Sequence, residues 1–412
     1  MRIMIDRGIE SEILPWIDSK EIIAIRGPRQ CGKTTFLGRI KEILLERGIK
    51  SKQIVSVNFE NDEEKEKFEN NALDYVRYLI NNGDEKTYLL FDEIQYVRKA
   101  GKLLKLIFDE MPYVKIFITG SSTLDLNEVG SFLVGRVLLF EMHPFSFEEF
   151  LLAKNEKLHR YYLEKRINLE KTNKIDKIIF LKELNDLVIE YITYGGYPAV
   201  VLENNFEKKK ILLKNLFETY IEKDIVKIYG QDYRKKVIDL IKVVASSSGS
   251  IVNYSDLSRI TSIYEKELKN VLHTLEATYV IKLILPFHKN LSTEIRKNPK
   301  IYFIDLGMRN NACSRYEFGE EEFGKLMENF VLLQIKEGKI NYWRTTAKAE
   351  VDFVINQEIP IEIKSNNVKI TRSFRSFIET YNPDRAFLLS LTEQSIEKIN
   401  KTEVNMLPLC LI

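Results

Sequence analysis

The residues with the most evident chemistry lie between Gly27 and Thr34, where the chain reads Gly-Pro-Arg-Gln-Cys-Gly-Lys-Thr. This spacing fits the pattern G-x-x-x-x-G-K-[ST], in which backbone N–H groups of a glycine-rich loop close around phosphates. We expect Lys33 to reach the β- and γ-phosphates of a nucleotide and Thr34 to bind Mg²⁺. The residues expected to contact the nucleotide in this loop are Gly27, Pro28, Arg29, Gln30, Cys31, Gly32, Lys33, Thr34 and Thr35.

The segments on either side of the loop fit this role. Residues 21–25 are mostly apolar and predict a buried strand, and residues 35–44 predict an amphipathic helix. The apolar face of that helix would consist of Phe36, Leu37, Ile40, Ile43 and Leu44. The N-terminus of a helix favours bound anions. Because strand, loop and helix follow in the required order, a glycine turn that arises by chance is the weaker interpretation.

Two adjacent acids follow another apolar run, residues 88–91. We expect Asp92 to hold Mg²⁺ through water and Glu93 to orient and deprotonate an attacking water. Paired acids can also cap a helix, but the phosphate-binding loop favours the catalytic interpretation. A further apolar run, residues 114–119, leads to Ser121, which we expect to sense the γ-phosphate.

Arg136 precedes the apolar run 137–140 and is the best candidate for an arginine finger. Such a cation stabilises the charge that develops on a transferring phosphoryl group. An ordinary surface arginine explains the same position equally well, so both interpretations stay open.

Taken together, the segments GPRQCGKTT, YLLFDEIQ, FITGSS and VGRVLLFEMHPFSFEEF resemble a group of prokaryotic AAA-type ATPases that is common in archaea and occurs in bacteria. The resemblance extends through Tyr194-Gly195-Gly196-Tyr197-Pro198 to the C-terminus, where this family carries a further domain. It implies ATP binding with Mg²⁺ and ATP hydrolysis.

Composition narrows the class of protein. A chain of 412 residues with 44% apolar content should form several domains, each with its own core. The net charge of +2 indicates no overall bias towards nucleic acid or membranes. Cys31, Cys313 and Cys410 have no paired spacing, which argues for reduced thiols without a zinc site. With no signal-like N-terminus and no run of about 20 apolar residues, we expect a cytoplasmic protein.

The order of elements predicts an α/β fold with four domains. Strands expected at 22–26, 53–58, 87–91, 114–119 and 137–141 alternate with helices, which predicts a mostly parallel sheet. The resemblance to AAA-type ATPases implies that residues 1–150 form the P-loop ATPase core and residues 151–230 a helical lid. Residues 231–310 would form a winged helix, and residues 311–412 a smaller α/β domain.

The predicted winged helix combines three amphipathic helices with a strand pair at 280–285 and 300–304. The loop between the strands is basic and contains His288, Lys289, Arg296 and Lys297, with Lys300 at its end and only Glu294 opposing. Such a loop would contact DNA phosphates. The third predicted helix, residues 264–277, is mixed in charge, and winged helices also bind proteins, so a protein partner remains an alternative.

The order of elements after residue 318 resembles restriction-endonuclease-like nucleases, including their acidic motif. If two strands pair around a turn near Gln357, Asp352 lies opposite Glu362 and Glu350 lies opposite Lys364. Asp352 and Glu362 would then share a divalent ion, with Lys364 as the third catalytic residue and Glu328 on the preceding helix. A half-exposed hairpin in an inactive binding module would show the same alternation.

Two hypotheses of function follow. The first is an ATP-dependent switch or motor that acts on DNA through the winged helix and the nuclease-like domain. The second is a signalling or scaffold ATPase whose C-terminal domains bind a protein partner without cleaving DNA. If Arg136 acts in trans on a second copy, the chain would form a homo-oligomer, and neither hypothesis involves a membrane.

Overall fold

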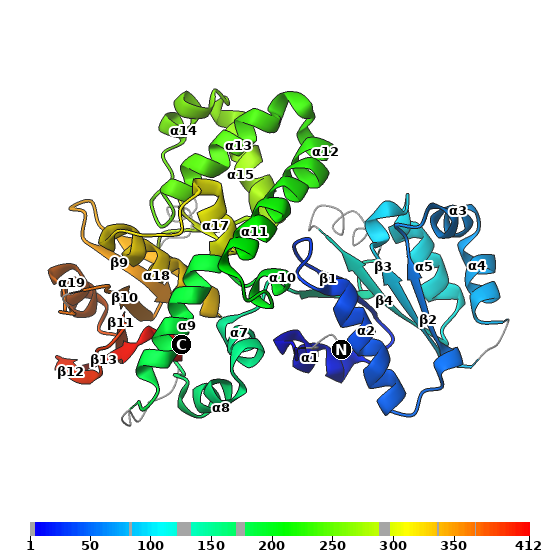
Figure 1. Ribbon diagram of the computed structural model, residues 1–412, viewed down its shortest axis with the longest axis horizontal. Coiled ribbons are helices and arrows are strands. Elements are labelled where there is room, and N and C mark those ends of the chain that lie inside the picture. Colours follow the sequence, from blue (N-terminus) through cyan, green and yellow to red (C-terminus); the bar gives the residue numbers. More distant parts are fainter. Residues whose placement is uncertain are drawn as a thin grey trace. The chain divides into compact units, whose positions relative to one another are not determined.

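Short apolar runs such as Ile22-Ile23-Ala24-Ile25 form the central strands of a sheet, and these strands are buried on both faces. The computed structural model describes residues 5–81, 85–121, 133–169, 178–287, 297–335, 338–366 and 368–412. Its first sheet consists of β1 (Ile22–Arg26), β2 (Ile54–Asn58), β3 (Thr87–Asp92), β4 (Val114–Gly120) and β5 (Val137–Glu141). The strands are parallel and lie in the order β2-β3-β4-β1-β5 (Figure 1). The predicted parallel sheet is therefore confirmed.

Helices cover both faces of this sheet, which explains why its strands are apolar without alternation. Helices α1 (Gly8–Ile13) and α2 (Lys33–Glu46) pack against one set of alternate strand residues: Ile23, Ile25, Tyr88, Leu90 and Phe117. Helices α3 (Asp62–Asn70), α4 (Ala72–Leu79) and α5 (Ala100–Glu110) pack against the other set: Ile22, Ala24, Leu89, Phe91, Ile116 and Ile118.

The parallel direction of the strands brings three loops to one edge of the sheet. β1 ends at Arg26 beside Gly120, the last residue of β4, and Phe91 near the end of β3 lies beside Ile118. The loop after β1, the acids at the end of β3 and Ser121 after β4 therefore meet at the carboxyl edge, where open α/β sheets bind ligands.

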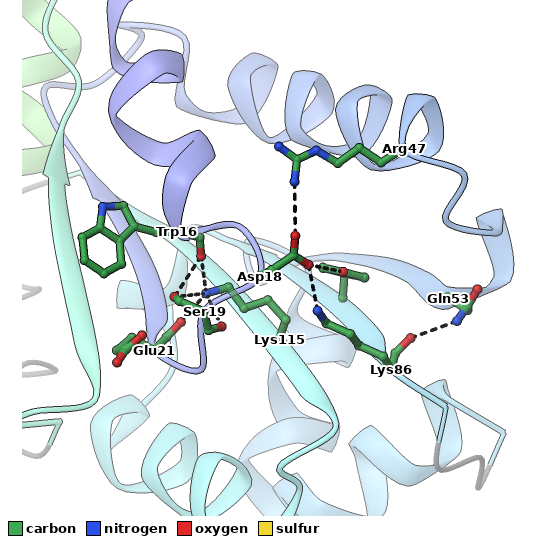
Figure 2. Close-up of polar contacts among 9 residues, drawn as sticks. Trp16, Asp18, Ser19, Glu21, Arg47, Gln53, Lys86 and Lys115 are labelled. Carbon is green, nitrogen blue, oxygen red and sulfur yellow. Dashed lines mark hydrogen bonds and ion pairs between the residues drawn. The ribbon is translucent and has the colours of Figure 1, made fainter.

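A buried lysine fixes the chain at the opposite, amino edge of the same sheet (Figure 2). Lys115 on β4 is 3% exposed. Its Nζ donates hydrogen bonds to three backbone carbonyls, those of Trp16 (3.0 Å), Ser19 (2.9 Å) and Glu21 (2.5 Å). Asp18 in the same segment accepts a hydrogen bond from Lys86 Nζ at 2.7 Å. These contacts hold residues 16–21 in place ahead of β1.

The chain divides into two units, Met1–Pro144 with Ala277–Tyr279, and Phe145–Glu276 with Val280–Ile412. The second unit begins with helices, and most of them lie in the region 151–230 that was predicted to be helical. They are α7 (Phe147–Lys154), α8 (Glu156–Lys165), α9 (Leu181–Tyr194), α10 (Pro198–Val201), α11 (Phe206–Tyr220), the π-helix η4 (Ile221–Ile225) and α12 (Val226–Tyr229).

The glycines between α9 and α10 are explained by a buried carboxylate. Gly195 has a φ of 75°, and a Cβ there would lie 2.4 Å from both carboxylate oxygens of Asp305. The Gly196 N–H donates to Asp305 Oδ2 at 2.7 Å, while Asp305 Oδ1 accepts from the Met308 N–H at 2.8 Å. Asp305 thus caps α17 (Leu306–Cys313) and holds the end of α9 against it.

Three helices and a two-stranded hairpin follow in the region predicted as a winged helix. They are α13 (Gln231–Ser246), α14 (Tyr254–Thr261), α15 (Glu265–Ala277), β6 (Ile281–Ile284) and β7 (Lys300–Phe303). Of the basic loop, His288, Lys289, Glu294 and Arg296 lie outside the described residues. Lys297 is exposed, whereas Lys300 is 2% exposed. The expectation that Lys300 contacts DNA phosphates is therefore wrong, because its ammonium is buried against acidic groups.

The last sheet has six strands in the order β12-β13-β11-β10-β9-β8. The strands are β8 (Ile340–Arg344), β9 (Glu350–Ile355), β10 (Ile359–Ile363), β11 (Arg385–Ser390), β12 (Ser395–Ile399) and β13 (Thr402–Pro408). Helices α18 (Glu320–Gln334) and α19 (Arg372–Tyr381) accompany them, and the 3-10 helix η5 (Leu409–Leu411) ends the chain. β9 and β10 are the two strands predicted to pair around Gln357, and α18 is the predicted helix that carries Glu328.

Among the described residues, we find no helix that has the length and apolar character needed to cross a membrane.

Candidate functional site

The loop between β1 and α2 has the backbone of a phosphate cradle. Gln30 and Gly32 have φ values of 59° and 104°, so the loop turns sharply before α2 begins at Lys33. Gly27 lies against the Met142 carbonyl, where a Cβ would approach the oxygen to 1.9 Å. Only glycine fits at this position. The first turn of α2 therefore opens towards the loop, where its N–H groups are available to an anion.

The Lys33 side chain is held by backbone carbonyls of the phosphate loop. The side chain is 4% exposed, and Nζ donates to the carbonyl oxygens of Gly27 (3.0 Å) and Pro28 (2.8 Å). These acceptors satisfy the buried ammonium. The phosphate oxygens of a nucleotide would offer the same ammonium stronger, charged acceptors.

Other predicted loop residues differ in exposure. Cys31 is buried, and its Sγ donates to the Met142 carbonyl at 3.2 Å, so its thiol faces the protein interior. Gln30, Thr34 and Thr35 are exposed, Arg29 is half-buried and Pro28 is buried.

The two expected Mg²⁺ ligands lie in contact with each other. Thr34 Oγ1 donates to Asp92 Oδ2 at 2.7 Å, and Thr119 Oγ1 donates to Asp92 Oδ1. Asp92 is buried, at 5% exposure. A hydroxyl and a carboxylate that converge beside a phosphate loop form a donor set that suits Mg²⁺, which prefers oxygen ligands. The residues present therefore fit the metal that the loop motif implies.

Glu93 occupies an unusual backbone position directly after this pair. Its φ is 56°, in the left-handed region that few residues with side chains adopt, and its N–H donates to Thr119 Oγ1 at 3.0 Å. Burial raises the pKa of the Glu93 carboxyl, while the positive charge of Lys33 opposes that shift. A carboxylate with a raised pKa is a better proton acceptor than one in water.

Ser121 and Glu93 are joined by a residue to which the sequence analysis gave no role. Gln95 Nε2 donates to Glu93 Oε2, and it also donates to Ser121 Oγ at 3.1 Å. Ser121 itself is 3% exposed. The position of Gln95 in the segment FDEIQ, two residues after Glu93, was the available sequence clue.

Arg7 is a second residue that the sequence analysis missed. Its Nη1 donates to the Cys31 carbonyl at 2.9 Å and its Nη2 donates to the His143 carbonyl at 2.6 Å. Arg7 thus ties the phosphate loop to the segment after β5. No pattern in the sequence relates these positions, because only the folded chain brings them together.

Arg136 lies at the amino edge, away from the phosphate loop. Its carbonyl accepts a hydrogen bond from the Ile22 N–H, at the start of β1, at 2.8 Å. Its guanidinium pairs with both carboxylate oxygens of Asp109, at 2.9 and 3.3 Å. The length of β1, about 3.3 Å per residue, separates Arg136 from the loop of its own chain. Arg136 therefore cannot act in cis, and action on a second copy stays a prediction.

In the second unit, the β9–β10 hairpin has the register that the sequence predicts. Phe353 pairs with Ile361, which places Asp352 opposite Glu362 as the next pair. Asp352 Oδ2 accepts the Ile363 N–H at 2.8 Å, and Lys364 Nζ pairs with Glu362 Oε1 at 2.7 Å. The opposite face of the hairpin is buried and apolar: Val351, Phe353, Ile361 and Ile363.

Two residues of β7 enlarge this acidic group. Lys300 Nζ lies 2.6 Å from Glu350 Oε1 and 3.9 Å from Glu328 Oε2. The Tyr302 hydroxyl donates to Glu328 Oε2 at 3.2 Å. Burial, reinforced by the charge of Asp352, raises the pKa of Glu328 to about 8. We call Lys300, Tyr302, Glu328, Glu350, Asp352, Glu362 and Lys364 the carboxylate cluster.

The fit of the carboxylate cluster to a divalent ion rests on one atom. Glu362 Oε2 is buried and has no hydrogen-bond partner within the described part of the chain. Such an oxygen suits a cation. The described residues include no group of three or more His, Cys, Asp or Glu side chains arranged to hold a metal ion. An ion shared by Asp352 and Glu362 therefore stays a prediction.

Comparisons with known proteins divide the chain into three segments. Residues 19–151 match an AAA domain family (AAA_14), residues 185–317 match a domain of unknown function (DUF8612), and residues 323–412 match another (DUF4143). Neither C-terminal match names a nuclease, so the likeness to restriction endonucleases stays a prediction.

Sequence similarity to two uncharacterised proteins extends over most of the chain. An uncharacterised protein of Methanocaldococcus jannaschii is 28% identical over 420 residues, which cover 96% of this chain and 87% of the relative. An uncharacterised protein of Haemophilus influenzae is 27% identical over 359 residues, covering 83% and 81%.

Among solved structures, PCH-2 of C. elegans is similar with a TM-score of 0.34 and 16% identity, covering 53% of this chain and 64% of that protein. A similarity of this size adds nothing to the fold described above. The match over residues 19–151, together with the parallel sheet and its loop between β1 and α2, supports an ATP-binding domain of the AAA type in this segment.

Proposed function

We propose that this chain is an ATP-dependent switch whose first unit binds ATP with Mg²⁺ and hydrolyses it. The observation that carries the proposal is the 2.7 Å contact between Thr34 Oγ1 and Asp92 Oδ2 beside the loop of Lys33. It joins the loop after β1 to the acid that ends β3, which are the two parts that this chemistry requires.

Each residue has a distinct role in the proposed reaction. Lys33 exchanges the loop carbonyls for β- and γ-phosphate oxygens, and the N-terminus of α2 faces the same charge. Mg²⁺ held by Thr34 and Asp92 would neutralise the negative charge that these phosphates share. Glu93 takes a proton from water as the water oxygen bonds to the γ-phosphorus and the bond to ADP breaks. Ser121 would sense the γ-phosphate, which is present before hydrolysis and absent afterwards.

Two substitutions separate nucleotide binding from hydrolysis. Lys33→Ala deletes the buried cation of the loop and should weaken ATP binding about 10- to 100-fold. Glu93→Gln keeps the metal ligands and removes the proton acceptor, so ATP binding should persist while hydrolysis slows about 10²- to 10⁴-fold. Equilibrium binding of a labelled ATP analogue and steady-state phosphate release measure the two effects.

Glu110→Gln provides a matched control, because Glu110 is an exposed glutamate at the end of α5. Its phosphate release should equal that of the wild type. Full turnover in Glu93→Gln would show that Glu93 is not the base.

We propose in addition that the second unit acts on DNA. The proposal is supported by the arrangement of three helices and a hairpin, which suits a winged helix, by the exposed Lys297, and by the pairing of Asp352 with Glu362. Asp352 and Glu362 would hold the divalent ion, and Lys364 would orient water or stabilise phosphate charge.

A protein partner in place of DNA is the rival proposal, and one observation favours it. Lys300 is buried in the carboxylate cluster, so the predicted basic loop has one cation fewer. Glu265 and Glu267 are exposed at the start of α15, where they would repel DNA phosphates. In this proposal the second unit holds a partner and ATP hydrolysis resets the complex.

A further inference from the structure

Gln95 connects the two strand ends that face the nucleotide. It lies in the short 3-10 helix η3 (Ile94–Tyr96), which follows β3 after Glu93. A single side-chain nitrogen, Nε2, donates both to Glu93 Oε2 and to Ser121 Oγ at 3.1 Å. The end of β3 and the end of β4 are therefore joined by one amide group.

The direction of the Glu93 carboxylate depends on this amide. The backbone of Glu93 is already fixed, because its N–H donates to Thr119 Oγ1 at 3.0 Å in the left-handed conformation. Thr119 is in turn bonded to Asp92, so the backbone is held against β4. Only the side-chain torsions of Glu93 remain to be set, and the hydrogen bond from Gln95 sets them.

The oxygen of the same amide is in a costly position. Gln95 Oε1 is buried and has no hydrogen-bond donor among the residues that the structure describes. Leaving a buried acceptor unpaired lowers stability, and such atoms are rare in folded proteins. A water molecule that attacks phosphorus has two O–H groups. Glu93 accepts from one of them, and Gln95 Oε1 is the buried acceptor next to Glu93 that suits the other.

We propose that Gln95 is a positioning residue for ATP hydrolysis, whose Nε2 links Glu93 to Ser121 and whose Oε1 orients the attacking water. The proposal rests on the proposed ATPase function. When Ser121 responds to the γ-phosphate, its hydrogen bond to Nε2 changes, and the same nitrogen transmits that change to the Glu93 carboxylate. The proton acceptor is thereby aligned when a γ-phosphate is present.

Gln95→Met tests this role against a purely structural one. Methionine has nearly the length of glutamine and fills the same space, but it has neither the amide donors nor the acceptor. If Gln95 only fills space, Met should leave kcat close to that of the wild type. If Gln95 positions Glu93 and water, kcat should fall about 10- to 100-fold with KM for ATP within about twofold.

Thermal stability adds an independent readout. Gln95→Met removes the unpaired acceptor Oε1 but also the two hydrogen bonds of Nε2, and because these effects oppose each other we expect a melting temperature close to that of the wild type. If Gln95→Met lowers kcat without lowering the melting temperature, the loss of activity is not caused by a less stable fold. Gln53→Ala is the control for kcat. Gln53 lies at the amino edge, where it donates to the Lys86 carbonyl (Figure 2), so this substitution should leave kcat unchanged.

A double substitution tests the link to Ser121. Ser121→Ala should lower kcat, and adding it to Gln95→Met should lower kcat no further, because both act through the same amide. Multiplicative losses in the double variant would overturn the link, and an unchanged kcat in Gln95→Met would overturn the positioning role. If the wild type hydrolyses no ATP and Lys33→Ala binds ATP normally, the ATPase proposal itself fails and this inference fails with it.

Discussion

Asp352 and Glu362 belong to the carboxylate cluster, in which four carboxyl groups lie beside two lysines. Lys300 pairs with Glu350 at 2.6 Å and Lys364 with Glu362 at 2.7 Å, while Asp352 is bonded to a backbone N–H. Removing one member of a buried charged group leaves its partner uncompensated and is strongly destabilising. Conservative substitutions are therefore the proper test of chemistry at these positions.

If the carboxylate cluster holds a divalent ion, the purified chain should nick supercoiled DNA in Mn²⁺. Asp352→Asn keeps the size of the side chain and removes its charge, so it should abolish nicking without changing ATP turnover, since Asp352 belongs to a different unit from the phosphate loop. Gel analysis of DNA across several metals and nucleotides measures the first effect, and phosphate release measures the second.

A DNA titration at 50 and 200 mM salt completes this test. Phosphate contacts predict that affinity falls steeply as salt rises. Binding without salt dependence, together with intact DNA in the wild type and in Asp352→Asn, would leave a partner-binding domain without nuclease chemistry.

The contacts that could be predicted from the sequence are those fixed by the direction and pairing of β-strands. Thr34 and Asp92 meet because parallel strands end at one edge, and Asp352 faces Glu362 because a hairpin fixes its own register. Gln95, Arg7 and Lys300 could not be assigned in this way. Their contacts depend on side-chain directions and on elements distant in the sequence, which no spacing rule specifies.

At the scale of elements, Asp305 is the group on which two helices depend. Its carboxylate accepts hydrogen bonds from the N–H groups of Gly196 and Met308, and the residue is buried, at 4% exposure. Burial raises the pKa of Asp305 from 3.8 to about 6, although the backbone hydrogen bonds oppose that shift. The same carboxylate that caps α17 is therefore costly to ionise.

The raised pKa of Asp305 predicts a pH dependence of stability. Between about pH 4 and pH 6 the folded chain binds a proton that the unfolded chain has already lost, so stability should fall as pH rises through this range. A shift of that size corresponds to about 3 kcal/mol. Chemical denaturation of wild type and Asp305→Asn across this range measures the effect as the difference between the two profiles.

Asp305→Asn retains a helix-capping oxygen but cannot ionise, so its stability should lack this component of the pH profile. The variant should lose stability relative to the wild type most at pH 4 and least at pH 6. Parallel profiles for the two proteins would contradict the assignment.

Most elements were predictable because their apolar patterns are local. The five strands of the first sheet agree with their predicted ranges within a residue, since most of them are apolar runs bounded by polar residues. β12 and β13 were missed for a physical reason. β12 is largely exposed and polar, with the sequence Ser-Ile-Glu-Lys-Ile, and it is a strand because β13 pairs with it.

At the scale of the whole molecule, the position of Arg136 bears on assembly. It lies at the amino edge of the sheet, paired with Asp109, so its own phosphate loop is out of reach. A catalytic role for this arginine would therefore require a second copy of the chain, whose phosphate loop it would approach.

If Arg136 acts on a second copy, ATP hydrolysis per chain should rise with protein concentration. Arg136→Ala and Lys33→Ala should each be inactive, and a mixture of the two should recover part of the activity, because each supplies what the other lacks. Phosphate release from titrated mixtures measures the recovery. Activity independent of concentration, with no recovery on mixing, would make Arg136 a structural partner of Asp109.

The contacts of Lys300 and Tyr302 also bear on how this chain can be divided or inherited. Both residues precede the predicted boundary at residue 310, yet both contact Glu328 beyond it, and Lys300 also pairs with Glu350. If the chain were cut at this boundary, the carboxylates of Glu328 and Glu350 would lose the lysine that they contact. The Lys300 ammonium, which is buried in the whole chain, would become exposed. The segments before and after residue 310 are therefore expected to be inherited together. Recombination that exchanged only one of them would also have to replace the groups that pair with Lys300.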